Sequence, residues 1–182
     1  MTGASFCSCK QLFIYIHSLY RCMRNMLIAL LLTLESVIVL AQLQSPDQFL
    51  GYKLGSRYTP HFRVVNYFKH VAEASSSFVK LEQYGETNEG RPLLLAYIAS
   101  PENASRLEAI RMNNLRLAGV ARDKMAPDIS GPAIVWLSYN VHGNETSSSE
   151  AAMLTIYELV NPGNANTKTW LKNTIVVIDP CI

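Results

Sequence analysis

Along residues 42–182, apolar residues recur with the period of a helix in some stretches and with the period of a strand in others. This pattern predicts alternating helices and strands. The first helical stretch is expected to extend through about Ala74, because Thr59-Pro60 is typical of an N-cap followed by proline at the first helical position. Its apolar positions recur at helical spacing and consist of Val64, Val65, Phe68, Val71 and Ala72. One face of this helix is therefore expected to pack on a core.

The next stretch, residues 79–98, reads as a β-hairpin. Its first half alternates apolar and polar residues, the turn-rich "GETNEG" follows, and residues 93–98 are almost continuously apolar. This pattern predicts two antiparallel strands, of which the second is the more buried. Ser100-Pro101 then repeats the cap-and-proline signal and predicts one helix up to about Leu117.

Residues 131–140, "GPAIVWLSYN", form a short β-branched and aromatic run that predicts a strand buried on both faces. A helix is expected from about Ser147 to Val160, and residues 174–180, "TIVVIDP", predict another buried strand. Strand, helix and strand in this order are typical of a parallel crossover. With the hairpin, they predict an α/β fold, a mixed parallel and antiparallel sheet flanked by helices. The edge of the last strand is expected to be unpaired, which favours aggregation of residues 42–182 alone.

The N-terminal region has the layout of a secretory signal. A short basic start follows Met23, residues 27–41 are mostly apolar, and small residues precede the predicted cut after Ala41. We therefore expect a leader and signal peptide over residues 1–41, and a secreted or periplasmic protein. Residues 1–22 have no place in such a signal, so our hypothesis is that they are not translated.

The alternative for residues 27–41 is a membrane anchor. This run is shorter than the ~20 residues of a spanning helix, and Glu35 lies near its middle. A carboxylate there opposes insertion, so no stable membrane span is expected.

Composition narrows the class of protein further. With 182 residues, 49% of them hydrophobic and 16% charged, the chain is long enough to form one globular domain over residues 42–182. The net charge of +2 comes from interspersed residues of both signs, so nucleic acid is not expected as a partner. Only Cys181 follows the predicted cut, so no disulfide is expected within the mature part.

The candidate chemistry lies in "YNVHGNETSSSEAA", where His142 and Glu145 follow a predicted buried strand and precede a helix. The carboxyl ends of the strands are where an open α/β sheet binds ligands, and imidazole and carboxylate are both zinc ligands. Gly143 allows the sharp turn between them. Ser147 and Glu150 fit a capping box, which gives Glu150 no further role.

A second pair with the same spacing, His70 and Glu73, serves as a control. It lies on the polar face of the first predicted helix, where such a pair is most simply a surface contact. Spacing alone therefore does not predict a metal site, and the strand context of His142 and Glu145 carries the argument.

Three segments resemble the zinc metallocarboxypeptidases related to carboxypeptidases A, B and the N/E group. "YNVHGNE" resembles the first zinc-binding segment of that family, "GETNEGRPLLLAYI" its upstream hairpin, and "YTPHFRVVNYFKHVAE" its opening helix. The resemblance extends from about Tyr52 to Ile182. It implies that His142 and Glu145 bind one zinc ion, and that the protein releases C-terminal amino acids from peptides or proteins through metal-activated water.

The resemblance also implies what the chain lacks. In the family, the second zinc histidine, the carboxylate-binding arginines, the closing tyrosine and the glutamate general base all come after the segment that ends here at Ile182. We therefore expect a carboxypeptidase-like fold truncated after roughly its first half, a missing third zinc ligand, no catalytic residue in the chain, and no activity alone. Two alternatives are an inactive truncated or degenerate product, acting at most as a binding module, and an aspartoacylase-like amidohydrolase, a class that also carries an HGNE-type segment.

Overall fold

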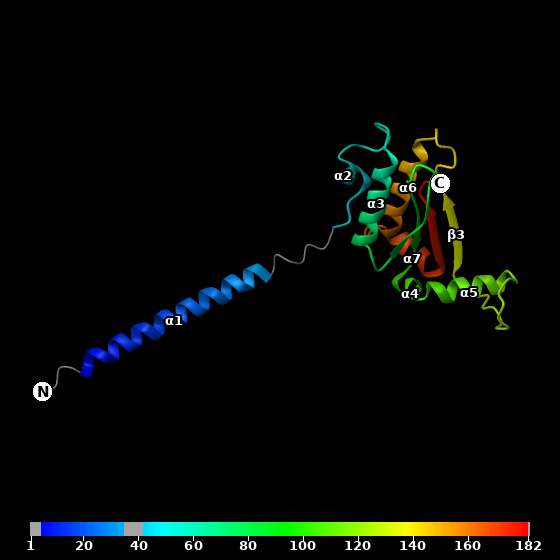
Figure 1. Ribbon diagram of the computed structural model, residues 1–182. Coiled ribbons are helices and arrows are strands. Elements are labelled where there is room, and N and C mark those ends of the chain that lie inside the picture. Colours follow the sequence, from blue (N-terminus) through cyan, green and yellow to red (C-terminus); the bar gives the residue numbers. More distant parts are fainter. Residues whose placement is uncertain (1–4, 35–41, 182) are drawn as a thin grey trace. The chain divides into compact units, whose positions relative to one another are not determined.

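The computed structural model describes residues 5–34 and 42–181 (Figure 1). The chain divides into two units, residues 1–40 and residues 41–182. The first unit contains one helix, α1 (Ser5–Leu34). In the described ranges, no helix is both long and apolar enough to cross a membrane. Residues 35–41, which include Glu35 and the predicted cut after Ala41, lie outside the described residues.

The second unit is an α/β domain built on a four-stranded sheet in the order β1-β2-β4-β3. β1 pairs with β2 and β2 with β4 in antiparallel fashion, whereas β3 and β4 are parallel. The mixed sheet and its flanking helices confirm the predicted fold class. The elements are α2 (Pro46–Leu50), α3 (His61–Ala74), β1 (Val79–Glu86), β2 (Pro92–Ile98), α4 (Pro101–Ala104), α5 (Leu107–Leu117), β3 (Ala133–Ser138), α6 (Ser147–Val160), α7 (Ala165–Asn173) and β4 (Thr174–Asp179).

Each face of the sheet has its own core. The larger core brings α3 and α6 against one face of the sheet, and its fully buried side chains include Phe68, Met153 and Ile178. The smaller core lies on the other face, where Ile110 of α5 packs near Ile175. Alternate residues of β4 enter the two cores, which explains why its sequence is continuously apolar.

The position of β3 corrects the sequence prediction. β3 was expected to be buried on both faces, yet it is an edge strand with Ile134, Val135 and Trp136 39%, 42% and 56% exposed. β4 lies between β2 and β3, so its expected unpaired edge is wrong too. Both strands are apolar, and composition does not reveal which of them the crossover places in the middle.

Two helix starts also differ from expectation. Thr59 is not the N-cap of α3: Pro60 holds that position, and the Thr59 hydroxyl donates a hydrogen bond to Glu150 Oε1 at 2.6 Å. The single helix expected after Ser100 is divided into α4 and α5. At the break, buried Asn103 donates its side-chain amide to the carbonyls of Leu171 and Lys172, which fixes α4 against the end of α7.

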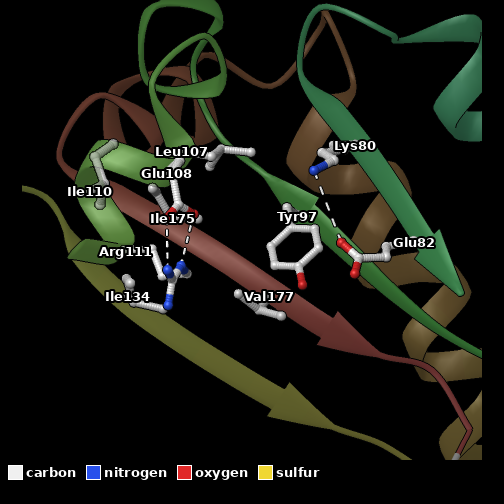
Figure 2. Close-up of a pocket in the computed structure, with 10 residues that line it drawn as sticks. All are labelled: Lys80, Glu82, Tyr97, Leu107, Glu108, Ile110, Arg111, Ile134, Ile175 and Val177. Atoms are coloured by element: carbon white, nitrogen blue, oxygen red, sulfur yellow. Dashed lines mark hydrogen bonds and ion pairs between the residues drawn. The ribbon is translucent and has the colours of Figure 1, made fainter. Parts of the chain in front are cut away.

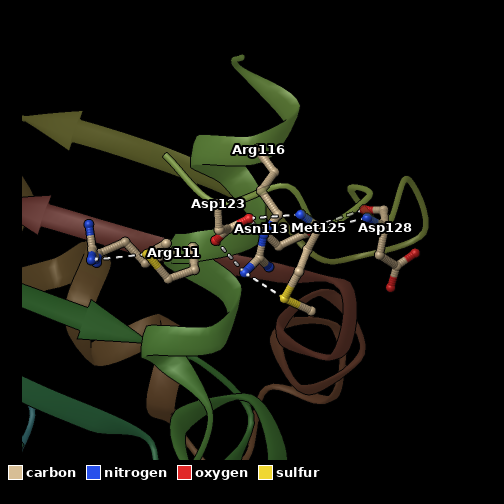
Figure 3. Close-up of polar contacts among 7 residues, drawn as sticks. Arg111, Asn113, Arg116, Asp123, Met125 and Asp128 are labelled. Carbon is tan, nitrogen blue, oxygen red and sulfur yellow. Dashed lines mark hydrogen bonds and ion pairs between the residues drawn. The ribbon is translucent and has the colours of Figure 1, made fainter. Parts of the chain in front are cut away.

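The segment between α5 and β3 is held to α5 by side chains (Figure 3). Arg116 donates from Nε and Nη2 to the two carboxylate oxygens of Asp123, both at 2.8 Å. Asn113 and Asp128 exchange two hydrogen bonds, each of 2.8 Å, between the Asn113 side chain and the Asp128 backbone. These contacts give a defined path to a segment that has no helix or strand of its own.

Candidate metal centre

His142 and Glu145 lie in the connection from β3 to α6, at the C-terminal end of the parallel pair. Glu145 N donates to His142 O at 2.9 Å, which closes a turn and brings the two side chains together. His142 Nδ1 and Glu145 Oε1 are 3.2 Å apart, and the side chains are 69% and 62% exposed. The fold thus brings the two side chains that the sequence singled out within hydrogen-bonding distance of each other.

The turn begins at a residue with an unusual backbone. Asn140 has a φ of +56°, which only a few per cent of residues other than glycine adopt. Its N–H donates to Ser148 Oγ at 2.7 Å, and its side-chain amide donates to Cys181 Sγ at 3.3 Å. The conformation is thereby fixed from α6 on one side and from the residues after β4 on the other.

This pair alone would be an incomplete metal site. Across residues 5–34 and 42–181, no group of three His, Cys, Asp or Glu side chains is arranged to hold a metal ion. A catalytic zinc site uses three protein ligands and one water, so two ligands give a weaker site. The exposure of both side chains leaves room for another ligand.

Asp179, at the end of β4, is a second carboxylate close to this edge. It pairs in register with Ser138 of β3 and is only 3% exposed. Tyr84 donates to Asp179 Oδ2 at 2.8 Å, while Asp179 Oδ1 has no hydrogen-bond partner within the described residues. Burial, together with this hydrogen bond, raises the pKa of Tyr84 to about 12, so the phenol stays protonated as a donor.

Glu150 has a different role from the one expected. α6 begins after Thr146, whose backbone is itself helical and whose side chain makes no cap, so the predicted capping box of Ser147 and Glu150 is wrong. Glu150 is 7% exposed and accepts hydrogen bonds from Gly55 N and Thr59 Oγ1, both at 2.6 Å. Its spacing from Met153, on the buried face of α6, is the sequence signal that was missed.

The control pair, His70 and Glu73, has contacts of its own within the domain. His70 is not simply part of a surface pair with Glu73, because its ring packs 5.1 Å from Phe49 and its Nε2 accepts a hydrogen bond from Gln44 N at 3.1 Å. Burial lowers the pKa of His70, and the charge of Glu73 opposes that shift. A neutral ring is what an acceptor nitrogen requires.

A cavity on the α5 side of the sheet is separate from these residues (Figure 2). Its floor consists of apolar side chains of the strands, and its rim carries the ion pairs Lys80–Glu82 and Glu108–Arg111. None of its lining residues belongs to the turn of His142 and Glu145.

Comparison with known proteins identifies the class. The profile described as zinc carboxypeptidase matches residues 64–182, which is more than half of the chain. The chain belongs to the zinc carboxypeptidase family. No curated protein matches the sequence.

Several solved structures are similar to this chain. Thrombin-activatable fibrinolysis inhibitor is similar with a TM-score of 0.50 and 12% identity, over 76% of this chain and 30% of that one. A carboxypeptidase A from Helicoverpa armigera gives a TM-score of 0.48 and 18% identity, over 75% of this chain and 30% of that one. A putative carboxypeptidase from Burkholderia mallei gives a TM-score of 0.47 and 15% identity, over 68% of this chain and 25% of that one. The chain thus spans less than a third of the length of the structures it matches.

Proposed function

We propose that this chain supplies the first two zinc ligands, His142 and Glu145, of a metallocarboxypeptidase that removes C-terminal amino acids from peptides or proteins. The observation that carries the proposal is the turn after β3, where Nδ1 of His142 and Oε1 of Glu145 lie 3.2 Å apart. Membership of the zinc carboxypeptidase family supports the same assignment and favours a peptidase over an aspartoacylase-like amidohydrolase.

The chemistry that follows is limited to what these residues do. Zinc, when bound, polarises a carbonyl and lowers the pKa of a water molecule. His142 offers an imidazole nitrogen and Glu145 a carboxylate, and the backbone of Asn140 and Glu145 orients both. Because only two protein ligands are assigned, this chain alone is expected to bind zinc weakly. We assign no general base to the described residues, so no peptidase activity is expected from this chain alone.

Secretion is part of the proposal. The layout of residues 23–41 supports a signal that is removed after Ala41. N-terminal sequencing of the protein recovered from the medium or the periplasm should then begin at Gln42. A retained residue before this position would contradict the proposed cut.

Zinc titration of matched variants tests the metal site. We expect His142→Ala and Glu145→Gln each to weaken zinc binding by at least about tenfold, because each removes one of two protein ligands. Binding is measured by competition with a chromophoric chelator. His70→Ala removes a histidine with the same HxxE spacing and should leave the affinity unchanged. Equal losses in the two histidine variants would reject the assignment.

A further inference from the structure

A pocket of about 170 Å³ with polar and apolar lining lies beside the turn of His142 and Glu145. Four parts of the domain line it. They are the segment before α3 together with the first residue of α3, the β1–β2 turn, the connection from β3 to α6 together with the first turn of α6, and the residue after Pro180. The residues that matter for its chemistry are His61, Thr87, Arg91, Asn140, Thr146 and Ser149. Gly143, between the two proposed zinc ligands, also lines the pocket, so a group bound there would be next to the metal pair.

The described lining contains a cation, several hydroxyl groups and no acid. The Asn140 amide and the Ser149 hydroxyl already donate to Cys181 Sγ, and the Thr59 hydroxyl donates to Glu150. Among the described residues that line the pocket there is one arginine and one histidine, but no aspartate or glutamate. Thr87 Oγ1 accepts from the N–H groups of Glu89 and Arg91, which leaves its hydroxyl hydrogen to donate. Thr146 and Ser149 lie at the N-terminal end of α6, where the helix dipole favours a negative charge.

The guanidinium of Arg91 is available to a ligand. Its Nη2 is paired with Glu89 Oε2 at 2.5 Å, and the two side chains are 57% and 69% exposed. An exposed ion pair of this kind contributes little, so another carboxylate can compete for the guanidinium. Burial, and after it the positive charge of Arg91, lowers the pKa of the neighbouring His61. An anion bound between the two side chains would raise the pKa of His61 again.

The buried carboxylate nearest in sequence to this lining does not cancel these donors. Glu150 follows Ser149, but both of its oxygens already accept hydrogen bonds, from Gly55 N and Thr59 Oγ1. Thr59 also lines the pocket, so its hydroxyl hydrogen is committed to Glu150, while both Glu150 oxygens are occupied. From these contacts we infer that the pocket binds a carboxylate of a peptide, with Arg91 as its principal partner.

This inference rests on the proposed function for the peptide nature of the ligand, but its test requires no metal. The full chain is labelled with ¹³C-histidine and titrated in buffer freed of metal by a chelating resin, and the resonance of His61 is assigned with a His61→Gln variant. The probes are acetyl-glutamate amide, which has only a side-chain carboxylate, acetyl-glutamine, which has only an α-carboxylate, and acetyl-glutamine amide, which has none.

The expected result is a saturable shift of the His61 resonance with at least one of the two carboxylate probes and none with the uncharged amide. The probe that binds identifies whether the carboxylate comes from a side chain or from a chain end. Arg91→Gln should weaken the binding by about tenfold, because one charge-assisted hydrogen-bonding partner is lost. Equal shifts with all three probes, or no shift with any, would overturn the inference.

Two further variants separate charge from folding. Glu89→Gln frees Arg91 from its surface pair and should strengthen binding a few-fold. Arg111→Gln is the matched control, since Arg111 is also 57% exposed and paired with a nearby glutamate, but lines the other cavity. It should leave binding unchanged, and a loss equal to that of Arg91→Gln would count against the pocket. Binding without any zinc affinity would reject the proposed function and leave the pocket standing.

Discussion

At the scale of single residues, Glu150 is the side chain whose environment differs most from what its sequence position indicates. Its two carboxylate oxygens receive Gly55 N–H and the Thr59 hydroxyl, and Tyr52 Oη lies 2.9 Å from the same Thr59 oxygen. A buried carboxylate with two donors from one loop is an anchor for that loop. The segment before α3 is thus tied to α6, the helix that follows the turn of His142 and Glu145.

Substituting Glu150 tests this anchor. Glu150→Gln keeps the size of the side chain but replaces one acceptor oxygen with an amide group, so one of the two donors loses its partner. We expect the free energy of unfolding to fall by about 1–3 kcal/mol. Urea unfolding measures the change, with the exposed Glu73→Gln as a control that should leave stability nearly unchanged. If Glu150→Gln left the free energy of unfolding unchanged, the loop would be held by other contacts.

The candidate site could be predicted only as far as chain-local signals reach. His142 and Glu145 share one turn, so their spacing and the strand before them identified the pair. The partners of Glu150 lie 91 and 95 residues away in the chain, and Arg91 reaches the same region from the hairpin turn. A local sequence pattern cannot indicate contacts between residues so far apart in the chain. The packed sheet brings these groups together.

At the scale of elements, local patterns specified the hairpin and α6 but not the order of the strands. The alternation before "GETNEG" gave β1 and β2 their places, and the antiparallel register of Val79 with Ile98 agrees with it. β3 and β4 have equally apolar sequences, and both obey the parallel crossover. Which of them lies at the edge depends on pairing with β2, a contact between distant segments that composition does not contain.

The exposed edge strand leads to a prediction about association. β3 carries no charge, proline or bulge of the kind that protects edges, and Trp136 is 56% exposed. Trp136→Lys should therefore raise the protein concentration at which aggregates form, by several-fold, while changing stability little. Light scattering measures this concentration. Trp170→Lys on α7, where the tryptophan is 59% exposed, is the matched control. Equal effects of the two variants would assign aggregation to exposed tryptophan in general rather than to the edge.

At the scale of the whole molecule, the larger core joins the two ends of the described domain. Its members extend from Leu50 to Ile178 and include Tyr67, which is fully buried and donates to Gln44 O at 3.0 Å. A phenol in this position connects the residues before α2 to the centre of the domain. Its ionisation would therefore be felt as a change in the stability of the whole core.

The alkaline pH dependence of unfolding follows from this burial. Burial, with smaller effects of Tyr157 and Glu158, raises the pKa of Tyr67 well above its ordinary value near 10. Above pH ~10 the unfolded chain loses the proton while the folded chain keeps it, so the unfolded state binds fewer protons and stability falls, by about 1.4 kcal/mol per pH unit for one such group. Tyr67→Phe should reduce this slope by about one proton in urea unfolding between pH 9 and 11, whereas the exposed Tyr58→Phe should not. An unchanged slope in Tyr67→Phe would mean that the phenol titrates in the folded core, and that the core opens around it before the domain unfolds.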